Sequence, residues 1–317
     1  MVRSHQRECA QQTAARIIRD KANCSQSNLW LHSHHARVTR RSSCGKRGFE
    51  GMKNFVFTMT TGRSGTTYLA ELARLNVQNA NCYHEILGWD RFGIDTPEVS
   101  HLTLFNSRGN IEPVRQFWKC KLSRIMREEG AYYCETSHLL MKAGLIENIK
   151  PLTEVGEVHL IEITRDPEEI AMSLILRGDF SNIGNMWMWY LDPTYPRNLL
   201  KLSDVSKIEN LCVWYVFEMR ARAAYYRKIA SDIEHIHFHE IDMKDLVSEE
   251  GAEKLLSDTG AELAVSKIRL PGQKNAGPSR KSLPSELRDR VRRVVEAASG
   301  LDVEGIAEQI ANRGPRF

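Results

Sequence analysis

One stretch of this sequence constrains the fold more than any other: FVFTMTTGRSGTTYLAELARL, residues 55–75. It starts with Phe55–Phe57, a short apolar run that is typical of a strand buried on both faces. A glycine-rich turn follows, and then an amphipathic segment with Leu69, Leu72 and Ala73 on one side. A buried strand that leads through glycines into a helix favours a parallel α/β sheet.

The remaining chain repeats this alternation. We expect strands at 131–136, 158–164 and 235–241, and helices at 111–128, 138–149, 167–177, 208–230 and over the terminal DVEGIAEQIANR. Strands that alternate with helices indicate a parallel sheet covered on both faces. We therefore predict a three-layer, P-loop-like α/β fold with a central parallel sheet flanked by helices. We expect residues 52–317 to form it as a single domain.

The first fifty residues differ from the rest in charge. They hold ten lysines and arginines and three acidic residues, a surplus of +7, so the remaining chain carries −3 of the total of +4. Because Met52 stands directly before the first strand, we expect residues 1–51 to be a basic, disordered or non-native extension; an organelle-targeting segment is the alternative. The basic surplus does not lie on a folded face, so we predict no nucleic-acid partner.

The seven cysteines are scattered and lack CxxC spacing, which indicates a reducing compartment and favours neither a disulfide scaffold nor a zinc site. No window holds 18 uninterrupted apolar residues, so we predict no membrane span. We therefore expect a cytoplasmic protein, with organelle targeting as the alternative. The oligomeric state stays open.

The loop TTGRSGTT is suited to binding an anion. Gly62 and Gly65 allow a tight turn, so the amides of Ser64–Thr67 can point at one phosphate at the start of a helix. Arg63 adds a bidentate donor. Nucleotide-hydrolysing loops place a lysine after their last glycine, and this loop does not. It is therefore poorly equipped to hold a triphosphate with a metal ion.

A second loop, in EITRDPEEIAMSLILRG, follows the strand at 158–164. Asp166 can cap the next helix, and Pro167 suits its first position. Arg165 then stands at the end of the strand, and Ser173 lies about 9 Å along the helix from Pro167, at 1.5 Å per residue. A cation and a hydroxyl so placed can hold a second phosphate. The alternative is that Arg165 pairs with a neighbouring carboxylate.

Together the two loops resemble the nucleotide sites of the sulfotransferases that use 3′-phosphoadenylyl sulfate (PAPS). In that superfamily a [KR]-S-G-[ST]-[ST] loop holds the 5′-phosphosulfate, and an R-D-P-x5-S motif holds the 3′-phosphate. The matching residues are Arg63, Ser64, Gly65, Thr66 and Thr67 in the first motif, and Arg165, Asp166, Pro167 and Ser173 in the second. The resemblance extends loosely over Met52–Arg293. It implies PAPS as donor, PAP as product and no metal, and it explains the missing lysine because PAPS has no γ-phosphate.

The resemblance also implies transfer to a hydroxyl or amine, with a general base near the acceptor. Glu85, in NCYHEILG, follows the loop helix as the catalytic glutamate does in sulfotransferases that act on tyrosine or carbohydrates; its neighbour His84 is a minor candidate. His138, in CETSHLL, is similar to the catalytic histidine of the K-[TS]-H-L-P strand end in cytosolic sulfotransferases. Thr136 and Leu140 replace the lysine and proline of that motif. We favour Glu85.

Residues 178–196 concentrate aromatic side chains, including Trp187 and Trp189, which either line an acceptor pocket or pack onto the sheet. Lys274 and Arg280 lie in a basic loop and either touch phosphate or stay solvated. The acceptor could be a small metabolite, a saccharide or a lipid. Alternative functions are a small-molecule kinase of the P-loop class and a non-catalytic PAP-binding protein.

Overall fold

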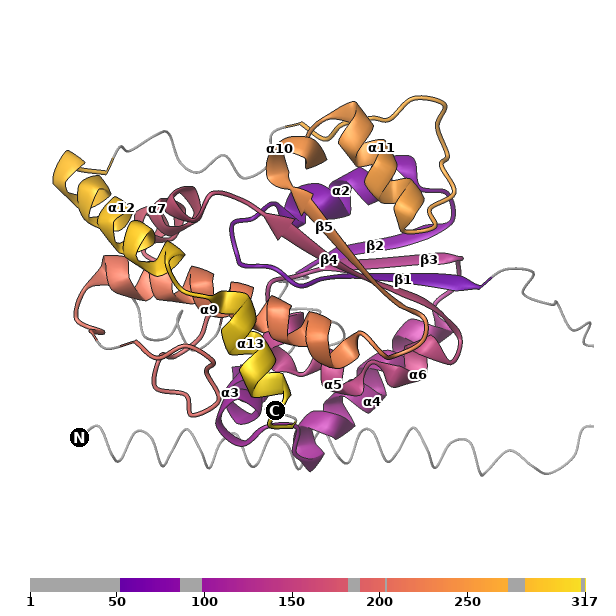
Figure 1. Cartoon of the computed structure of the whole chain (residues 1–317). Helices are drawn as coiled ribbons and strands as arrows, with labels where there is room; N and C mark the ends of the chain where they lie inside the picture. Colours follow the sequence, from indigo (N-terminus) through magenta and orange to yellow (C-terminus); the bar gives the residue numbers. More distant parts are fainter. Residues whose placement is uncertain (1–51, 86–98, 182–188, 203, 273–282, 315–316) are drawn as a thin grey trace, which may run out of the picture. The chain divides into compact units, whose positions relative to one another are not determined.

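The computed structural model describes residues 52–85, 99–181, 189–202, 204–272, 283–314 and 317. Five strands in this part of the chain form one sheet in which all neighbours are parallel, in the order β2-β3-β1-β4-β5 (Figure 1). The strands are β1 (Lys53–Thr58), β2 (Ala80–His84), β3 (Tyr132–Thr136), β4 (Gly156–Thr164) and β5 (Ile236–Asp242). The first strand, β1, lies in the middle of the sheet, with β3 and β2 on one side and β4 and β5 on the other. Ligands bind at such a change of direction in open parallel sheets.

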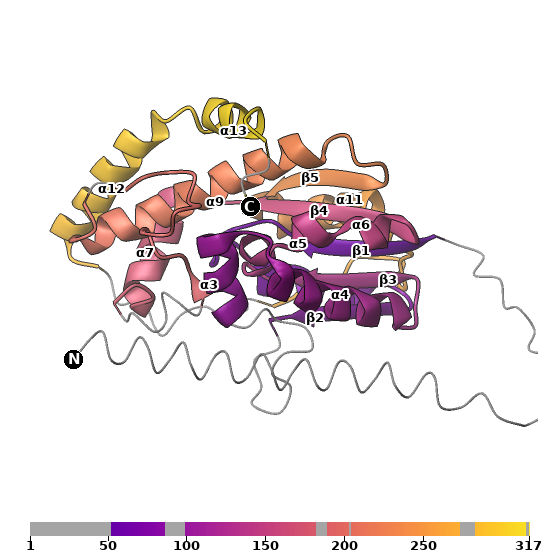
Figure 2. The ribbon, with the colours of Figure 1, turned by 90° about the horizontal axis from the view of Figure 1, so that it is seen from below.

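Helices cover both faces of the sheet. One face carries α2 (Thr66–Asn76), α10 (Met243–Leu246) and α11 (Glu249–Asp258) (Figure 1). The other face carries α3 (Val99–Arg108), α4 (Glu112–Arg127), the 3₁₀ helix η1 (Leu140–Ala143), α5 (Leu145–Asn148), α6 (Lys150–Thr153), α9 (Ile208–Ala230) and α13 (Val303–Ala311). Both α7 (Pro167–Arg177) and α12 (Ser285–Ser299) pack against α9 (Figure 2). These layers confirm the predicted α/β fold.

The buried core is divided by the sheet into two clusters. Phe55 and Phe57 of β1 point to the side of α9, and Val56 between them points to the side of α2. All three side chains are fully buried. A strand with apolar residues on both faces needs helices above and below it, so this run alone already required a three-layer arrangement.

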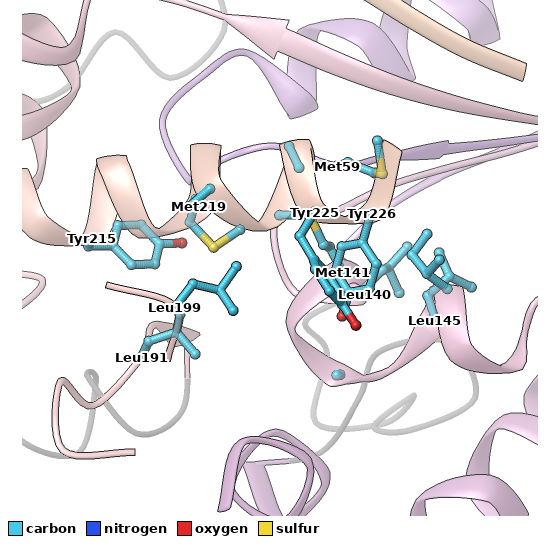
Figure 3. Packing of buried hydrophobic residues seen from close by; sticks show 14 of the residues in the cluster. Met59, Leu140, Met141, Leu145, Leu191, Leu199, Tyr215, Met219, Tyr225 and Tyr226 are labelled. Atoms are coloured by element: carbon cyan, nitrogen blue, oxygen red, sulfur yellow. The ribbon is translucent and has the colours of Figure 1, made fainter. Parts of the chain in front are cut away.

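The long helix α9 is the main apolar element on its side of the sheet. Figure 3 shows Tyr215, Met219, Tyr225 and Tyr226 along it, with Met59 from the end of β1 close by. The predicted helix over 208–230 is confirmed, and one apolar stripe along it is buried, formed by Cys212, Tyr215, Met219, Ala223, Tyr226 and Ala230. None of the described helices combines the length and the apolar character that a bilayer crossing requires.

The helix behind β4 begins and ends where the sequence predicts. Asp166 accepts a hydrogen bond from the amide of Glu168 at 2.8 Å and so caps α7, and a proline occupies the first turn. The helix ends at Gly178, whose φ of 69° is left-handed. This well-defined start fixes the height of Ser173 above the carboxyl end of β4.

The prediction of one helix over 138–149 is wrong. The segment divides into η1 and α5 at Gly144, which has a φ of 96°. A Cβ on Gly144 would lie 2.9 Å from the ring of Phe105, so α3 packs directly on this backbone. The strand β2 and the helix α3 were not predicted. Every residue of β2 is only partly buried, so it has no continuous apolar run.

Candidate functional site

The candidate site lies at the edge of the sheet where the strands β1, β2, β3 and β4 have their carboxyl ends. The loop from Met59 to Gly65 follows β1, and residues 165–166 follow β4. Glu85 follows β2, and residues 137–139 follow β3. Parallel pairing places these four ends side by side. Arg63, Glu85, His138 and Arg165 therefore lie at one edge of the sheet, and Thr66, Thr67 and Ser173 lie on the helices α2 and α7 that start there.

The loop after β1 has the backbone shape of an anion-binding nest. Arg63 and Gly65 are both left-handed, with φ values of 69° and 111°, and α2 starts directly after them. Such alternation turns successive amides toward one point, at the positive end of the helix. A Cβ on Gly65 would lie 2.4 Å from the sulfur of Met243, so the Met243 side chain would have to move, and the left-handed φ disfavours any residue other than glycine. The predicted tight turn at Gly65 thus has both a conformational and a steric reason.

Buried hydroxyls hold the loop from inside. Thr60 Oγ1 lies 2.8 Å from both Ser64 Oγ and the carbonyl oxygen of Ile163, and Ser64 donates to the carbonyl of Thr61 at 2.7 Å. Ser64 is fully buried. Its hydroxyl therefore stabilises the turn.

The two loops predicted to bind phosphate are in contact. Arg63 Nε donates to Ser173 Oγ at 3.0 Å, although the residues are 110 positions apart. Arg165 Nη1 donates to the carbonyl of Arg63 at 3.1 Å, across 102 positions. Arg220, which the sequence did not indicate, donates from α9 to the carbonyl of Arg165 at 3.0 Å. Three arginines and one hydroxyl from separate elements thus meet at the ends of β1 and β4.

Arg165 also pairs with a carboxylate, as the alternative interpretation expected. Its Nη2 lies 2.8 Å from Glu169 Oε2, one turn along α7. The two side chains are 37% and 51% exposed. An ion pair this exposed contributes about 0.2–1 kcal/mol, so an arriving phosphate can compete for the guanidinium.

Positive charge accumulates around Arg63. Burial lowers the pKa of Arg63, and the nearby charges of Arg177 and Arg165 lower it further, whereas Tyr190 and Asp179 raise it. Asp179 lies 3.4 Å from Arg177 and offsets part of this charge. Like charges held together in a partly buried place favour the binding of an anion.

A small hollow opens beside these arginines. It is lined by residues of the loop after β1, of β4 and the loop that follows it, and of α7 and α9, including Thr61, Glu162, Arg165 and Arg220. Its volume of about 10 Å³ is close to the room needed by one water molecule. The hollow marks the accessible side of the loop that follows β4.

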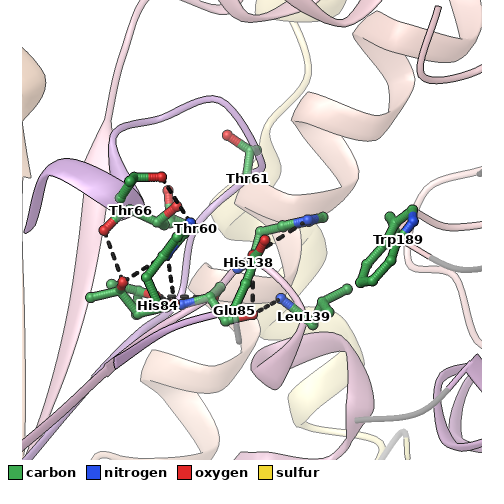
Figure 4. A network of polar contacts seen from close by, with 12 residues as sticks. Thr60, Thr61, Thr66, His84, Glu85, His138, Leu139 and Trp189 are labelled. Atoms are coloured by element: carbon green, nitrogen blue, oxygen red, sulfur yellow. Dashed lines mark hydrogen bonds and ion pairs between the residues drawn. The ribbon is translucent and has the colours of Figure 1, made fainter. Parts of the chain in front are cut away.

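The two predicted candidates for the base lie together at the ends of β2 and β3 (Figure 4). Glu85 Oε1 accepts hydrogen bonds from the amide of His138 at 3.0 Å and from Ser137 Oγ at 3.2 Å. His138 Nε2 lies 3.5 Å from the same oxygen. The side chains of Glu85 and His138 are 12% and 8% exposed. The two alternatives of the sequence analysis are therefore parts of one cluster.

His138 also borders the phosphate loop. A Cβ on Gly62 would lie 3.4 Å from His138 Nδ1 and from the ring of Tyr190. Burial is the main reason that the pKa of His138 lies well below its usual range, and the charges of Lys142, His84, Arg177 and Arg63 lower it in turn. The imidazole is therefore neutral at pH 7.

His84 has a different arrangement from its neighbour. Its Nδ1 lies 3.0 Å from the carbonyl oxygen of Thr136, and its Nε2 lies 2.8 Å from Thr67 Oγ1. A carbonyl only accepts, so Nδ1 carries the proton and Nε2 accepts from the threonine. Both ring nitrogens are thus used to join α2 to the end of β3 (Figure 4).

The aromatic segment contributes core next to the site. Tyr190 is 4% exposed, and its ring packs against Phe180, Tyr215 and His138 at centroid distances of 4.9, 5.2 and 5.3 Å. Trp187, Lys274 and Arg280 lie outside the described residues. Lys142 and Tyr215 also touch His138. No sequence signal pointed to them, because Lys142 lies just outside the CETSHLL motif and Tyr215 lies 77 positions away in an apolar helical segment.

The structure is similar to the crystal structure of a sulfotransferase from Alicyclobacillus acidocaldarius, with a TM-score of 0.44 and 11% sequence identity. The match covers 83% of this chain and 97% of that chain. No protein-family model matches the sequence, and no curated protein matches it.

Proposed function

We propose that this protein transfers the sulfuryl group of PAPS to a hydroxyl or amine of an acceptor. One observation carries the proposal: Arg63, Arg165 and Ser173, from two loops about a hundred residues apart, are joined by hydrogen bonds of 3.0 and 3.1 Å. The two-motif resemblance requires this convergence, because one donor nucleotide must span the loop that holds its 5′-phosphosulfate and the arginine and serine that hold its 3′-phosphate.

The proposed reaction is a single in-line displacement. The acceptor oxygen or nitrogen bonds to sulfur while the bond from sulfur to the bridging oxygen of PAPS breaks, and PAP leaves with that electron pair. Arg63 and the amides of the loop stabilise the charge on the leaving phosphate. Glu85 takes the proton from the acceptor. Among the described residues, the contacts of Glu85 fall on Oε1, so we assign the proton to Oε2.

Binding of PAP to the full chain tests the donor site. In calorimetry without divalent metal, we expect PAP to bind, and Arg63→Ala or Arg165→Ala to weaken binding by about 10- to 100-fold, because each removes hydrogen bonds to a charged group worth about 1.5–3 kcal/mol. Arg74→Ala is the matched control, since Arg74 lies on the exposed side of α2 and pairs with Glu71. Preference for ATP over PAP would instead favour a P-loop kinase.

Transfer from sulfur-labelled PAPS tests the base. A panel of metabolites, saccharides and lipids first identifies an acceptor, and Glu85→Gln should then leave PAP affinity unchanged while lowering kcat by at least about 100-fold. Loss of transfer in His138→Ala with full activity in Glu85→Gln would reverse the assignment. PAP binding without transfer to any acceptor would favour a non-catalytic PAP-binding protein.

The proposal extends to the organisation of the chain. We propose that residues 52–317 are the transferase domain, that the basic residues 1–51 are not part of the catalytic machinery, and that the protein acts in the cytoplasm. In the described residues no group of three or more histidine, cysteine or acidic side chains is placed to hold a metal ion. Chelation of metal during the transfer assay tests the expected independence from Mg²⁺.

A further inference from the structure

Lys142 is buried beside the candidate base and has no role in the proposed reaction. It belongs to η1, and its side chain is fully inaccessible. Its Nζ lies 3.0 Å from His138 Nδ1, 3.1 Å from Tyr215 OH and 2.5 Å from the carbonyl oxygen of Trp189. A lysine is rarely buried to this degree unless its amine is paired, and these three contacts supply the pairing.

The three neighbours match the donors of an ammonium group. Lysine offers three N–H donors and no acceptor, and each neighbour can accept one bond. The rings of Tyr190 and Tyr215 lie 5.5 and 5.0 Å from Nζ and add cation–π attraction. Burial holds the pKa of Lys142 well below its usual range, and the Glu85 carboxylate raises it. A neutral amine has only two N–H donors and a lone pair, so donation to all three neighbours requires the ammonium form, which the Glu85 carboxylate and the two rings favour.

Tyr215 is the second group that faces the same ring nitrogen. Its hydroxyl lies 3.2 Å from His138 Nδ1. Burial raises the pKa of Tyr215, so the hydroxyl keeps its proton. Because Lys142 donates to the tyrosine oxygen, the hydroxyl hydrogen can point at His138. Two donors therefore converge on Nδ1.

We infer that Lys142 and Tyr215 keep Nδ1 of His138 unprotonated and so fix the Nε2–H tautomer, which makes His138 a positioning residue for Glu85. Nε2 then directs its proton toward Glu85 Oε1, 3.5 Å away. This distance exceeds a normal hydrogen bond, and contacts of this kind in unliganded sites often shorten when substrate binds. The inference rests on the proposed role of Glu85 as the base.

This arrangement separates the roles of the two candidates. Neutral His138 has no nitrogen ready to accept a proton, since Nε2 already carries one and Nδ1 faces Lys142 and Tyr215. Turning the ring over would leave the buried amine of Lys142 without one of its acceptors, which is costly. The carboxylate of Glu85 has no such obstacle. The acceptor proton therefore goes to Glu85, and His138 orients the carboxylate through its ring and its amide.

Nuclear magnetic resonance of the ¹⁵N-labelled full chain tests the tautomer without any activity assay. Long-range ¹H–¹⁵N spectra at pH 7, with the His138 signals identified by their loss in His138→Gln, should show a protonated Nε2 and an unprotonated Nδ1. In Lys142→Met/Tyr215→Phe both donors are gone, and His138 should shift to a mixture of tautomers. An Nδ1–H or doubly protonated ring in the natural protein, or unchanged signals in the double variant, overturns the inference.

A pair of substitutions tests the positioning role. The amide of Gln can replace the Nε2–H donor but cannot act as a base at neutral pH. We therefore expect His138→Gln to retain at least about tenfold more kcat than His138→Ala, with the KM for PAPS unchanged in both. Equal losses of kcat would overturn the positioning role. Absence of transfer in the natural protein would contradict the proposed function, while the spectra would still decide the tautomer.

Discussion

Arg63 combines a strained backbone with two separate interactions. Its left-handed conformation costs a residue with a Cβ roughly 1–2 kcal/mol. The carbonyl of Arg63 accepts from Arg165, and its guanidinium donates to Ser173. Strain of this kind persists where the surroundings fix the chain, and here it lets the loop turn its amides to one side while the side chain reaches α7.

The shape of the Arg63 side chain should matter as well as its charge. Lysine keeps the charge but lacks the fork with which arginine can bond Ser173 and a phosphate together. We expect Arg63→Lys to weaken PAP binding about tenfold, less than Arg63→Ala does, in calorimetry at constant salt. Ser173→Ala should weaken PAP binding to a similar extent, because it removes the hydroxyl to which Arg63 donates. Wild-type affinity in Arg63→Lys would contradict this account.

Among the helices and strands, those whose boundaries depend on neighbouring residues could be predicted from the sequence. The helix α7 has its proline and apolar face within eleven residues and its cap directly before them, and the prediction of 167–177 is correct at both ends. The strand β2 was missed, because half-buried residues at the sheet edge carry no apolar run. The break at Gly144 depends on Phe105, 39 positions away, so no local window could reveal it.

The pair β4 and β5 carries a cluster of histidines at the end of the sheet away from the candidate site. His159 is 5% exposed, and its Nδ1 lies 3.0 Å from His239 Nε2, while its Nε2 lies 3.1 Å from Asn54 Oδ1. Burial lowers the pKa of His159 to about 4, and the neighbouring His239 and His237 contribute. The folded protein thus keeps this ring neutral.

This cluster predicts a loss of stability in mild acid. Between pH 6.5 and about 4, the unfolded chain binds a proton at His159 that the folded chain does not bind, so the free energy of unfolding falls as the pH falls. We expect His159 to contribute about 1–2 kcal/mol to the loss between pH 7 and pH 5, measured by urea unfolding. His159→Gln should reduce this loss, and the difference between the two proteins should stay constant between pH 7 and 8. An equal loss in both proteins would contradict the prediction.

At the scale of the molecule, the parallel sheet assembles the candidate site. Four strands from separate parts of the chain end at one edge, and this brings Glu85 to His138 and Arg63 to Ser173. The sequence motifs predicted which residues belong to the candidate site. They could not predict that both candidate bases share one cluster, because this depends on the unpredicted strand β2 beside β3. Nor could they indicate Lys142, whose importance comes only from its three neighbours.

The basic residues 1–51 precede the sheet in the sequence. All residues proposed to bind PAP lie within residues 52–317, so a chain starting at Met52 should fold and bind PAP. Removing residues 1–51 takes away a surplus of +7 and changes the net charge from +4 to −3. Long-range attraction of the anionic ligand should therefore weaken at low ionic strength, whereas at 0.15 M salt, where the screening length is about 8 Å, the affinities of the two chains should agree within about threefold. Calorimetry of both chains at 0.02 M and 0.15 M salt measures this difference. Loss of PAP binding by the shorter chain at both salt concentrations, with its unfolding transition intact, would show that the segment contributes ligand contacts of its own.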